Sequence, residues 1–305
     1  MADIAIIVNP KSASGRTARD WNRLVPHVPQ HADVCFTDAP GRAIELTAHA
    51  LRTGARTILA VGGDGTVNEV VNGIFASGAP TSEIRLAVVP CGTSSDLCRS
   101  LAIPGDAVKA AELLRMGNFR KIDAMHVRYA ATDGRMVSRY ALNVVSFGMG
   151  GVVAARTNWT RFLGGRLSFL AAIGLTAFSY SSKTVSIRLD EGPPLETRIT
   201  NVAVGNGRFH GAGMCVCPNA ALDDGLLDVT VIGPLSMYEL ARDIGVLYNG
   251  RLCSHARVQS YRARRIEADS GHDVMIEIDG EPVGRLPVEI SVIPEAIQIA
   301  CQACY

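Results

Sequence analysis

The stretch that decides the fold is Val61-Gly62-Gly63-Asp64-Gly65-Thr66-Val67-Asn68-Glu69-Val70-Val71. It follows residues 56–60, Arg-Thr-Ile-Leu-Ala, whose β-branched and apolar side chains predict a buried strand. After the glycines, Val67, Val70, Val71 and Ile74 have the spacing of one face of a helix. Three glycines and one aspartate are therefore predicted to lie at a strand-to-helix turn.

A turn of this composition suits a phosphate group. Glycine allows a positive φ and lets a ligand approach the backbone closely. The helix that follows presents N–H groups and the positive end of its dipole. The carboxylate of Asp64 would repel a phosphate unless a cation lies between them. A magnesium–nucleotide site is therefore the favoured interpretation.

Part of the stretch also has a structural explanation. Thr66 and Glu69 have the spacing of a capping box, with Thr66 as the N-cap residue and Glu69 three positions later. This alternative explains those two residues without a ligand. It does not explain a carboxylate flanked by glycines.

The residues around this stretch alternate between strand and helix patterns over the first ~125 positions. Three polar or glycine-rich turns, at 9–15, 62–66 and 90–96, each follow a predicted strand. Alternation of this kind predicts an α/β domain, in which a parallel sheet carries helices on both faces. Because ligands bind at the carboxyl ends of such strands, the three turns are expected to converge on one site.

From about Ile122 the pattern changes to strands, predicted at 122–129, 137–146, 184–190, 198–205, 227–233, 264–268, 274–278 and 288–293. Asp133-Gly134, Asp224-Gly225 and Asp279-Gly280 are turn signals among them. This half is predicted to be a β-rich antiparallel sandwich or barrel. The apolar segment 163–180 is predicted to be a helix that packs on the core or docks on a membrane; it is too interrupted for a confident membrane span.

Composition restricts the class of protein. The chain has 305 residues, of which 48% are hydrophobic, and a formal net charge of +1, which is typical of a globular protein with a sizeable core and gives no support to a nucleic-acid partner. The first residues show no secretory signal, and the eight cysteines are expected to be reduced core residues of a cytoplasmic protein. The pair Cys301 and Cys304 is weak evidence for a metal or redox site.

Several motifs, taken in order, resemble the diacylglycerol kinase catalytic-domain family, and most closely the bacterial YegS-like lipid kinases. They are Asn9-Pro10 with Ser14-Gly15, Gly62-Gly63-Asp64-Gly65-Thr66 with Asn68-Glu69, Pro90-x-Gly92-Thr93 with Ser95-Asp96, Gly205-Asn206-Gly207, Asp223-Asp224-Gly225 with Leu227-Asp228, and Asp279-Gly280-Glu281-Pro282. The resemblance covers nearly the whole chain. It implies an ATP-binding kinase domain over 1–123, a β-rich domain over 124–294, and a return of 295–305 to the first domain, with the active site between the two.

The resemblance further implies the transfer of the γ-phosphoryl group of ATP to the hydroxyl group of a diacylglycerol-like lipid, with Mg²⁺. It assigns nucleotide binding to Asn9, Pro10, Gly15, Thr37, Gly62, Gly63, Asp64, Gly65, Thr66, Asn68, Glu69, Gly92 and Thr93. It assigns catalytic roles to Glu281 as the general base, to Asp64 as a metal-binding residue, and to Asp123 as support for the metal and the base.

A second magnesium site is implied at Ala221, Asp224 and Leu226. Structural alternatives exist for three of these positions: Asp279-Gly280 is an ordinary hairpin turn, Asp123 has the position of a strand-end aspartate, and Asp223-Asp224-Gly225 is an ordinary turn. The chain also departs from the common family pattern at Ser95, at Ser146-Phe147-Gly148 and at Gly211-Ala212-Gly213. The resemblance therefore does not identify which lipid is the acceptor.

Two other functions remain as alternatives: an NAD kinase, which shares the Gly62–Thr66 turn, and a non-catalytic module that binds a nucleotide or a lipid. A lipid acceptor implies peripheral association with a membrane surface, through the helix near 163–180 or through the basic cluster Arg257, Arg262, Arg264 and Arg265. A homodimer is compatible with the sequence.

Overall fold

The computed structural model describes residues 3–92, 94–160 and 165–302. The chain forms two compact units: unit 1 comprises Met1–Ala124 and Pro294–Tyr305, and unit 2 comprises Met125–Ile293. The chain therefore passes from one unit to the other twice, once within strand β5 and once within strand β17.

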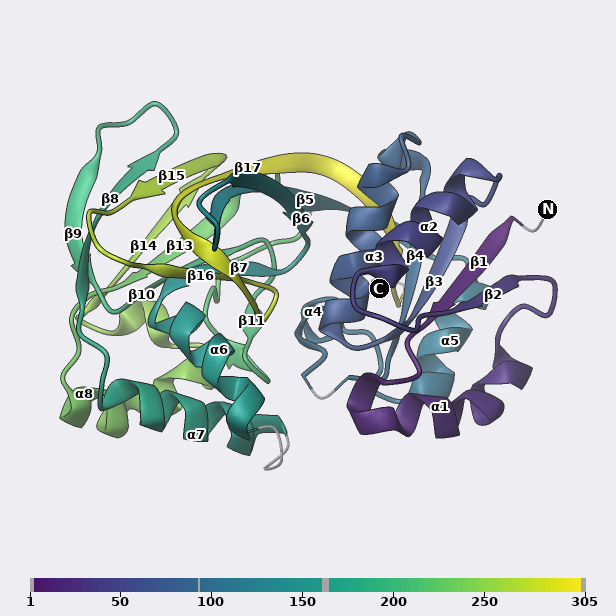
Figure 1. Ribbon diagram of the computed structural model, residues 1–305, viewed down its shortest axis with the longest axis horizontal. Coiled ribbons are helices and arrows are strands. Elements are labelled where there is room, and N and C mark those ends of the chain that lie inside the picture. Colours follow the sequence, from purple (N-terminus) through teal and green to yellow (C-terminus); the bar gives the residue numbers. More distant parts are fainter. Residues whose placement is uncertain (1–2, 93, 161–164, 303–305) are drawn as a thin grey trace. The chain divides into compact units, whose positions relative to one another are not determined.

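Unit 1 alternates strands and helices along the chain (Figure 1). Its elements are β1 (Ile4–Val8), α1 (Ser12–Leu24), β2 (Asp33–Phe36), α2 (Arg42–Arg52), β3 (Thr57–Gly62), α3 (Asp64–Ala76), β4 (Arg85–Pro90), α4 (Asp96–Ser100) and α5 (Ala107–Met116), with the first part of β5 (Phe119–Ala131) and the last part of β17 (Glu281–Ala300).

The sheet of unit 1 is parallel, with the order β17–β4–β3–β1–β2. Every residue of β3 is buried, as expected for a central strand that is covered on both faces. Helices α2 and α3 cover one face and α1 and α5 cover the other (Figure 1). The predicted α/β domain, a parallel sheet with helices on both faces, is confirmed.

Two local predictions in unit 1 are wrong. The capping box does not form: α3 begins at Asp64, its N-cap residue is Gly63, and Thr66 lies inside the first turn. Glu69 instead accepts hydrogen bonds from the backbone N–H groups of Gly41 and Ala43, at 2.8 and 3.1 Å, where α2 begins. Helix α1 begins at Ser12, within the segment predicted as a turn, although Ala13 and Gly15 keep positive φ angles of 50° and 84°.

Unit 2 is built mainly from strands. After β5 its elements are β6 (Met136–Ala141), β7 (Val144–Gly148), α6 (Met149–Thr160), α7 (Gly165–Ala177), β8 (Lys183–Leu189), β9 (Leu195–Ile199), β10 (Asn201–Gly205), β11 (Phe209–His210), β12 (Met214–Cys215), β13 (Leu227–Ile232), α8 (Met237–Asp243), β14 (Val258–Ala263), β15 (Arg265–Asp269) and β16 (Met275–Ile278), followed by β17.

Antiparallel pairing joins the strands of unit 2 in the order β14–β13–β10–β7–β16–β17, and β17 also pairs with β5 and β15. Strands β15, β8 and β9 continue the pairing as a second layer. Apolar side chains from both layers, such as Phe147, Val204 and Ile266, form the core between them. The predicted β-rich sandwich is confirmed.

Three strand predictions in unit 2 need correction, and other strands were not predicted. Residues 137–146 and 198–205 each form two strands rather than one. Strand β14 was not predicted, and the segment predicted at 288–293 is part of the 20-residue strand β17. The aspartate–glycine turns at 133–134 and 279–280 do connect paired strands, as predicted.

Helices α6, α7 and α8 lie together on one side of the strands of unit 2 (Figure 1). A second apolar cluster, which includes Met149, Ile173 and Ile232, fills the space between these helices and the sheet. No helix in the described part of the chain has both the length and the apolar run needed to span a bilayer.

Candidate functional site

The three turns that were expected to converge do meet at the carboxyl ends of the strands of unit 1. The backbone N–H of Asn9 donates to the carbonyl oxygen of Val61 at 3.0 Å. The side-chain amide of Asn9 donates to Oγ1 of Thr66, also at 3.0 Å, which joins the first turn to the start of α3. Thr66 is 5% exposed, so this contact is part of the packing of the turn.

Asp64 joins the glycine turn to the third turn. Its Oδ2 accepts a hydrogen bond from the backbone N–H of Ser95 at 2.8 Å, and its Oδ1 accepts one from the N–H of Asp96 at 3.1 Å. Ser95 has a left-handed backbone, with φ 50° and ψ 45°, an uncommon conformation for a residue with a side chain. The carboxylate therefore has a structural role that the sequence did not reveal.

The glycines of these turns are required by close packing. A Cβ atom on Gly92 would lie 2.5 Å from Cα of Gly63, and one on Gly62 would lie 2.5 Å from Oγ1 of Thr66. Neither position tolerates a side chain without a shift of its neighbours. Together with the N–H groups of the first turn of α3, which have no partner within the helix, this backbone forms a surface that a phosphate group can approach.

Gly92→Ala is expected to separate these two turns, because the atom that it meets belongs to backbone and cannot rotate away. We expect a loss of about 1–3 kcal/mol in the free energy of unfolding and an increase of at least about 10-fold in the Kd for ATP. Denaturant unfolding and equilibrium ATP binding measure the two effects. Gly271→Ala is the control, since a Cβ atom there meets nothing within 4 Å. An ATP affinity unchanged by Gly92→Ala would remove the turn from the nucleotide site.

The other residues predicted to bind the nucleotide lie in different environments, some at the sheet edge and some in the interior of unit 1. Thr37 directly follows β2, and its backbone N–H donates to the carbonyl oxygen of Val8 at 2.9 Å, so it lies at the same edge of the sheet. Asn68 is 2% exposed within α3, and Glu69 accepts hydrogen bonds at the start of α2, so both have structural contacts besides their predicted role. Pro10 lies in the first turn, Gly15 and Gly65 lie near the starts of α1 and α3, and Thr93 lies outside the described residues.

A polar pocket of about 270 Å³ lies beside the third turn of unit 1. Gly92 lines it together with Arg16 and Arg23, which lie seven residues apart on α1 and therefore on one face of that helix. These arginines were not predicted as site residues. Their spacing was the available signal, but an exposed basic residue on a helix is common and carries little information by itself.

Asp123 is a buried residue within β5 rather than a strand-end residue. It is 1% exposed, and its Oδ1 accepts a hydrogen bond from the backbone N–H of Glu295 at 2.8 Å. Glu295 has a positive φ of 48°, and its carboxylate lies 2.6 Å from the ammonium of Lys121. Asp123 therefore holds β5 and β17 together within unit 1, one residue before β5 enters unit 2.

Glu281 is the first residue of β17 in unit 2. Its side chain is 45% exposed, and its Oε2 accepts a hydrogen bond from Nη2 of Arg139 at 3.0 Å. The preceding turn has positive φ angles at both Asp279 (49°) and Gly280 (89°), as expected for an aspartate–glycine hairpin turn. Burial raises the pKa of the nearby Tyr129, and Glu281 adds to this effect while Arg139 opposes it. Glu281 is thus an accessible carboxylate with one cationic partner.

The second magnesium site at Ala221, Asp224 and Leu226 stays a prediction, and in this structure the side chain of Asp224 has protein partners. The guanidinium group of Arg262 pairs with Oδ2 of Asp224, and the N–H of Leu226 donates to Oδ1 at 3.1 Å. Arg262 also lies 3.4 Å from the buried carboxylate of Asp228, whose pKa burial raises and Arg262 lowers. Among the described residues no group of three or more His, Cys, Asp or Glu side chains is placed to hold a metal ion. No step of the chemistry below uses this turn.

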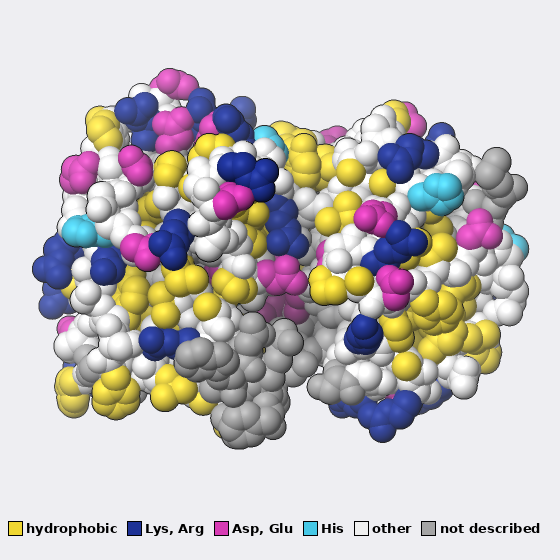
Figure 2. Space-filling view, viewed as in Figure 1, with side chains coloured by type: hydrophobic (Ala, Val, Ile, Leu, Met, Phe, Trp, Pro, Cys, Tyr) yellow, Lys and Arg dark blue, Asp and Glu magenta, His cyan; other side chains and the backbone are white. Residues whose placement is uncertain are grey.

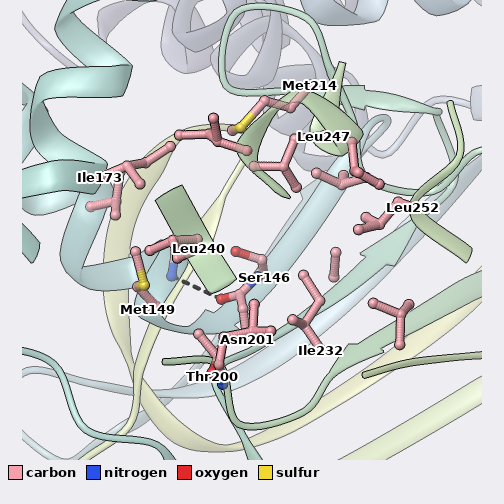
Figure 3. A pocket seen from close by; sticks show the side chains of 18 of the residues that line it. Ser146, Met149, Ile173, Thr200, Asn201, Met214, Ile232, Leu240, Leu247 and Leu252 are labelled. Atoms are coloured by element: carbon pink, nitrogen blue, oxygen red, sulfur yellow. Dashed lines mark hydrogen bonds between the residues drawn. The ribbon is translucent and has the colours of Figure 1, made fainter. Parts of the chain in front are cut away.

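A second, apolar cavity of about 110 Å³ lies within unit 2, between the sheet and the helices (Figure 3). Met149, Ile173, Met214, Leu240, Leu247 and Leu252 are among the apolar residues that line it. Ser146, Thr200 and Asn201 lie on the side formed by the sheet, so a few polar groups face a mostly apolar space (Figure 3). Such a cavity suits a hydrocarbon chain better than a nucleotide.

Comparison with known families agrees with the division of the chain into unit 1 and unit 2. Residues 3–127 match the model of the diacylglycerol kinase catalytic domain. Residues 143–301 match the model of the YegS C-terminal NAD kinase beta sandwich-like domain. The two matches together span nearly the whole chain.

Individual relatives are similar over the same length. A probable lipid kinase YegS-like protein of Pseudomonas aeruginosa is 28% identical over 97% of this chain and 93% of its own. A diacylglycerol kinase of Mycobacterium tuberculosis is 25% identical over 97% of this chain and 94% of its own. The crystal structure of a putative diacylglycerol kinase from Bacillus anthracis has the same fold, with a TM-score of 0.79 at 23% identity over 98% and 95% of the two chains. The chain therefore belongs to the family that joins a diacylglycerol kinase catalytic domain to a YegS-type C-terminal β-sandwich domain.

Proposed function

We propose that this protein is a lipid kinase that transfers the γ-phosphoryl group of ATP to the hydroxyl group of a diacylglycerol-like lipid. The observation that carries the proposal is the apolar cavity of unit 2, in a chain whose other unit matches a kinase catalytic domain. A nucleotide as acceptor would not need a cavity lined mainly by Met, Ile and Leu side chains. The names of the relatives from P. aeruginosa and M. tuberculosis support the same class of substrate.

In this proposal ATP binds to the turns of unit 1. Phosphoryl transfer depends mainly on alignment and on neutralisation of charge. The backbone of the glycine turn and the first turn of α3 would contact the phosphates. Arg16 and Arg23 would add guanidinium donors beside Gly92, in a pocket that Asp20 and Asp106 also line. Mg²⁺ bound with the nucleotide would neutralise the phosphate oxygens, and Asp64 is the residue that we propose to hold it, directly or through water.

Glu281 is proposed as the general base. As the lipid oxygen forms its bond to the γ-phosphorus, the bond from that phosphorus to the bridging oxygen breaks, ADP leaves, and the hydroxyl proton moves to the carboxylate of Glu281. Its exposure of 45% lets an acceptor reach it, and the hydrogen bond from Arg139 fixes one of its oxygens. Asp123 supports this chemistry indirectly, because it holds β17 at Glu295.

The acceptor resides in a membrane, so the protein needs a surface that binds one. The exposed apolar residues on and beside α7 and α8 supply it: Leu167, Leu175, Phe178 and Tyr238 are 63%, 55%, 84% and 73% exposed. Figure 2 shows hydrophobic side chains along the edge of unit 2 formed by these helices. We propose this surface rather than the basic cluster, because Arg257, Arg262 and Arg265 are already paired with acidic side chains.

Phe178→Ser is expected to reduce membrane binding by about 10-fold or more, since burial of one such side chain stabilises binding by about 1.5–3 kcal/mol. Co-sedimentation with phosphatidylcholine–phosphatidylglycerol vesicles measures the bound fraction. Leu195→Ser, at an exposed site on β9, is the control and is expected to bind as the unchanged protein does. Equal binding by the Phe178 variant would exclude this surface.

The test of the function is an acceptor panel. The purified protein is incubated with γ-labelled ATP and Mg²⁺, and with diacylglycerol, monoacylglycerol, phosphatidylglycerol or a sphingoid base in mixed micelles, while NAD is supplied in a parallel reaction. Label in one lipid class, lost in Glu281→Ala, would support the proposal and identify the acceptor. Label in NAD would replace it with an NAD kinase activity, and bound nucleotide without any transfer would indicate a regulatory module.

A further inference from the structure

Glu277 is a buried carboxyl group of unit 2 that the chemistry above does not use. It lies on β16, and its side chain is 0% exposed. Its Oε1 accepts a hydrogen bond from Oγ of Ser146 at 2.6 Å and lies 3.2 Å from Nε2 of His210. Its Oε2 accepts a hydrogen bond from the backbone N–H of Gly280 at 2.7 Å. Both oxygens are therefore engaged, as burial of a carboxyl group requires.

The partners of Glu277 come from three separate segments. Ser146 is on β7 and is 1% exposed, and His210 is on β11 and is 8% exposed. The ring of Phe169, on α7, packs edge-on against the ring of His210 with the centroids 6.0 Å apart. The carboxyl group of Glu277 is thus held by groups whose own positions are fixed by packing.

The third partner, Gly280, belongs to the turn that leads into Glu281. At Asp279 the same turn is attached to β7, because its N–H donates to the carbonyl oxygen of Val144 at 2.9 Å and its Oδ1 accepts from the N–H of Val144 at 3.1 Å. The hydrogen bond from the N–H of Gly280 to Glu277 anchors the turn at its second residue. The pairing of β16 with β17 shifts register between Ile276 and Glu277, so the regular ladder does not fix the turn alone.

Burial of a carboxyl group at this position has an unfavourable desolvation free energy. Burial raises the pKa of Glu277, while His210, Ser146 and the N–H of Gly280 oppose the rise. An aspartate–glycine turn forms readily without such a contact, and an apolar residue would fill the space at a lower cost in desolvation. What the carboxyl group adds is a fixed hydrogen bond to the residue that precedes Glu281.

We propose that Glu277 is a positioning residue that holds Glu281 in place through the N–H of Gly280. The proposal rests on the proposed function, in which Glu281 is the general base. Ser146 and His210 also line the apolar cavity, so the residues that hold Glu277 form part of the wall that the lipid chain would contact (Figure 3). The cavity and the Glu281 hairpin are therefore connected through one cluster of three side chains.

The first test is hydrogen exchange at the hairpin, which needs no activity. Glu277→Ala is expected to increase the exchange rate of the Gly280 amide by about 10-fold or more, because it removes the acceptor, whereas Glu277→Gln keeps an acceptor oxygen and retains most of the protection. Unchanged protection of Gly280 in Glu277→Ala would overturn the proposal.

The second test is kinetic. Glu277→Ala is expected to lower kcat by about 10- to 100-fold with the KM for ATP within about twofold of its original value, since small displacements of a reacting group have effects of this size. Glu277→Gln is expected to recover most of kcat. Val229→Ala, which removes apolar volume from β13 at a buried site, is the control for destabilisation alone and is expected to keep kcat while folded.

A pair of variants separates positioning from a general structural effect. In a Glu281→Gln background, Glu277→Ala is expected to have no further effect on the residual kcat. Glu277 acts only by positioning the carboxylate of Glu281, and that carboxylate is absent in this background. An equal loss of kcat in both backgrounds, or a folded Glu277→Ala with the original kcat, would overturn the proposal. If the unchanged protein labels no lipid, the proposed function fails, and the exchange result still decides whether Glu277 holds the hairpin.

Discussion

Glu281→Gln is expected to lower kcat for lipid phosphorylation by about 10²- to 10⁴-fold, the range that general base catalysis contributes. The amide has the shape of the carboxylate, and its oxygen still accepts the hydrogen bond from Arg139, but it does not take up the hydroxyl proton at neutral pH. The change affects stability little, since an ion pair with a half-exposed carboxylate contributes about 0–1 kcal/mol. Steady-state rates with γ-labelled ATP, together with a thermal unfolding curve, measure both quantities.

The matched control is Glu191→Gln, an exposed glutamate in the turn between β8 and β9. It removes the same charge from unit 2 and is expected to keep kcat. A Glu281→Gln protein that turns over at the original rate would show that another group accepts the proton, and Glu281 would then be only part of a hairpin.

Asp64→Asn is expected to have the second largest effect, on both stability and catalysis. The carboxylate accepts hydrogen bonds from two consecutive N–H groups, those of Ser95 and Asp96. Asparagine offers one oxygen and one NH₂ group, so one backbone N–H would face another donor. We expect a loss of about 1–3 kcal/mol in the free energy of unfolding and a decrease of about 10²-fold or more in kcat at saturating ATP.

Asp190→Asn is the control for loss of the charge of a turn carboxylate. Asp190 also accepts from two consecutive backbone N–H groups, those of Arg264 and Arg265, at 2.8 and 2.9 Å, in an exposed turn of unit 2, but both bond to Oδ1. Because asparagine keeps that oxygen as an acceptor, this variant is expected to lower stability less than Asp64→Asn and to keep kcat. If Asp64→Asn changed stability alone, with kcat intact in the folded fraction, Asp64 would be a structural link between two turns and not a residue of the catalytic site.

The α/β half of the fold was predictable because its signals are local. A strand such as β3 is apolar throughout, and the glycine turn and the helix follow it directly in the sequence. The meeting of the three turns followed from the rule that parallel strands end at one edge. The same rule gave the general position of Asn9, Asp64 and Gly92, whereas Thr37 was assigned through the family resemblance.

The errors arose where a side chain finds a partner far away in the chain. Glu69 fits a capping box locally, but its partners lie in α2, and the separation of 28 residues gives no signal in the sequence. Here a tertiary contact replaced the local one. Asp224 also has a partner that the sequence does not show, because Arg262, which lies 38 residues later, pairs with it.

The same reason explains why the full length of β17 and the burial of Glu277 were missed. Pro282, Pro287 and Pro294 interrupt the strand pattern of β17, which nevertheless continues because it exchanges partners between the two units. Glu277 lies in Met275-Ile276-Glu277-Ile278, where alternation predicts a solvent-facing acid. It is buried because Ser146 and His210, from distant segments, supply the hydrogen bonds that it needs.

The measurement that tests the central claim most directly is the transfer of label from γ-labelled ATP to diacylglycerol in mixed micelles with Mg²⁺, in parallel preparations of the unchanged protein and of Glu281→Gln. The account predicts label in the phosphorylated lipid with the unchanged protein and a loss of at least about 10²-fold with the variant, while both proteins bind ATP equally. Label found only in inorganic phosphate or in NAD, or equal labelling of lipid by both proteins, would contradict it.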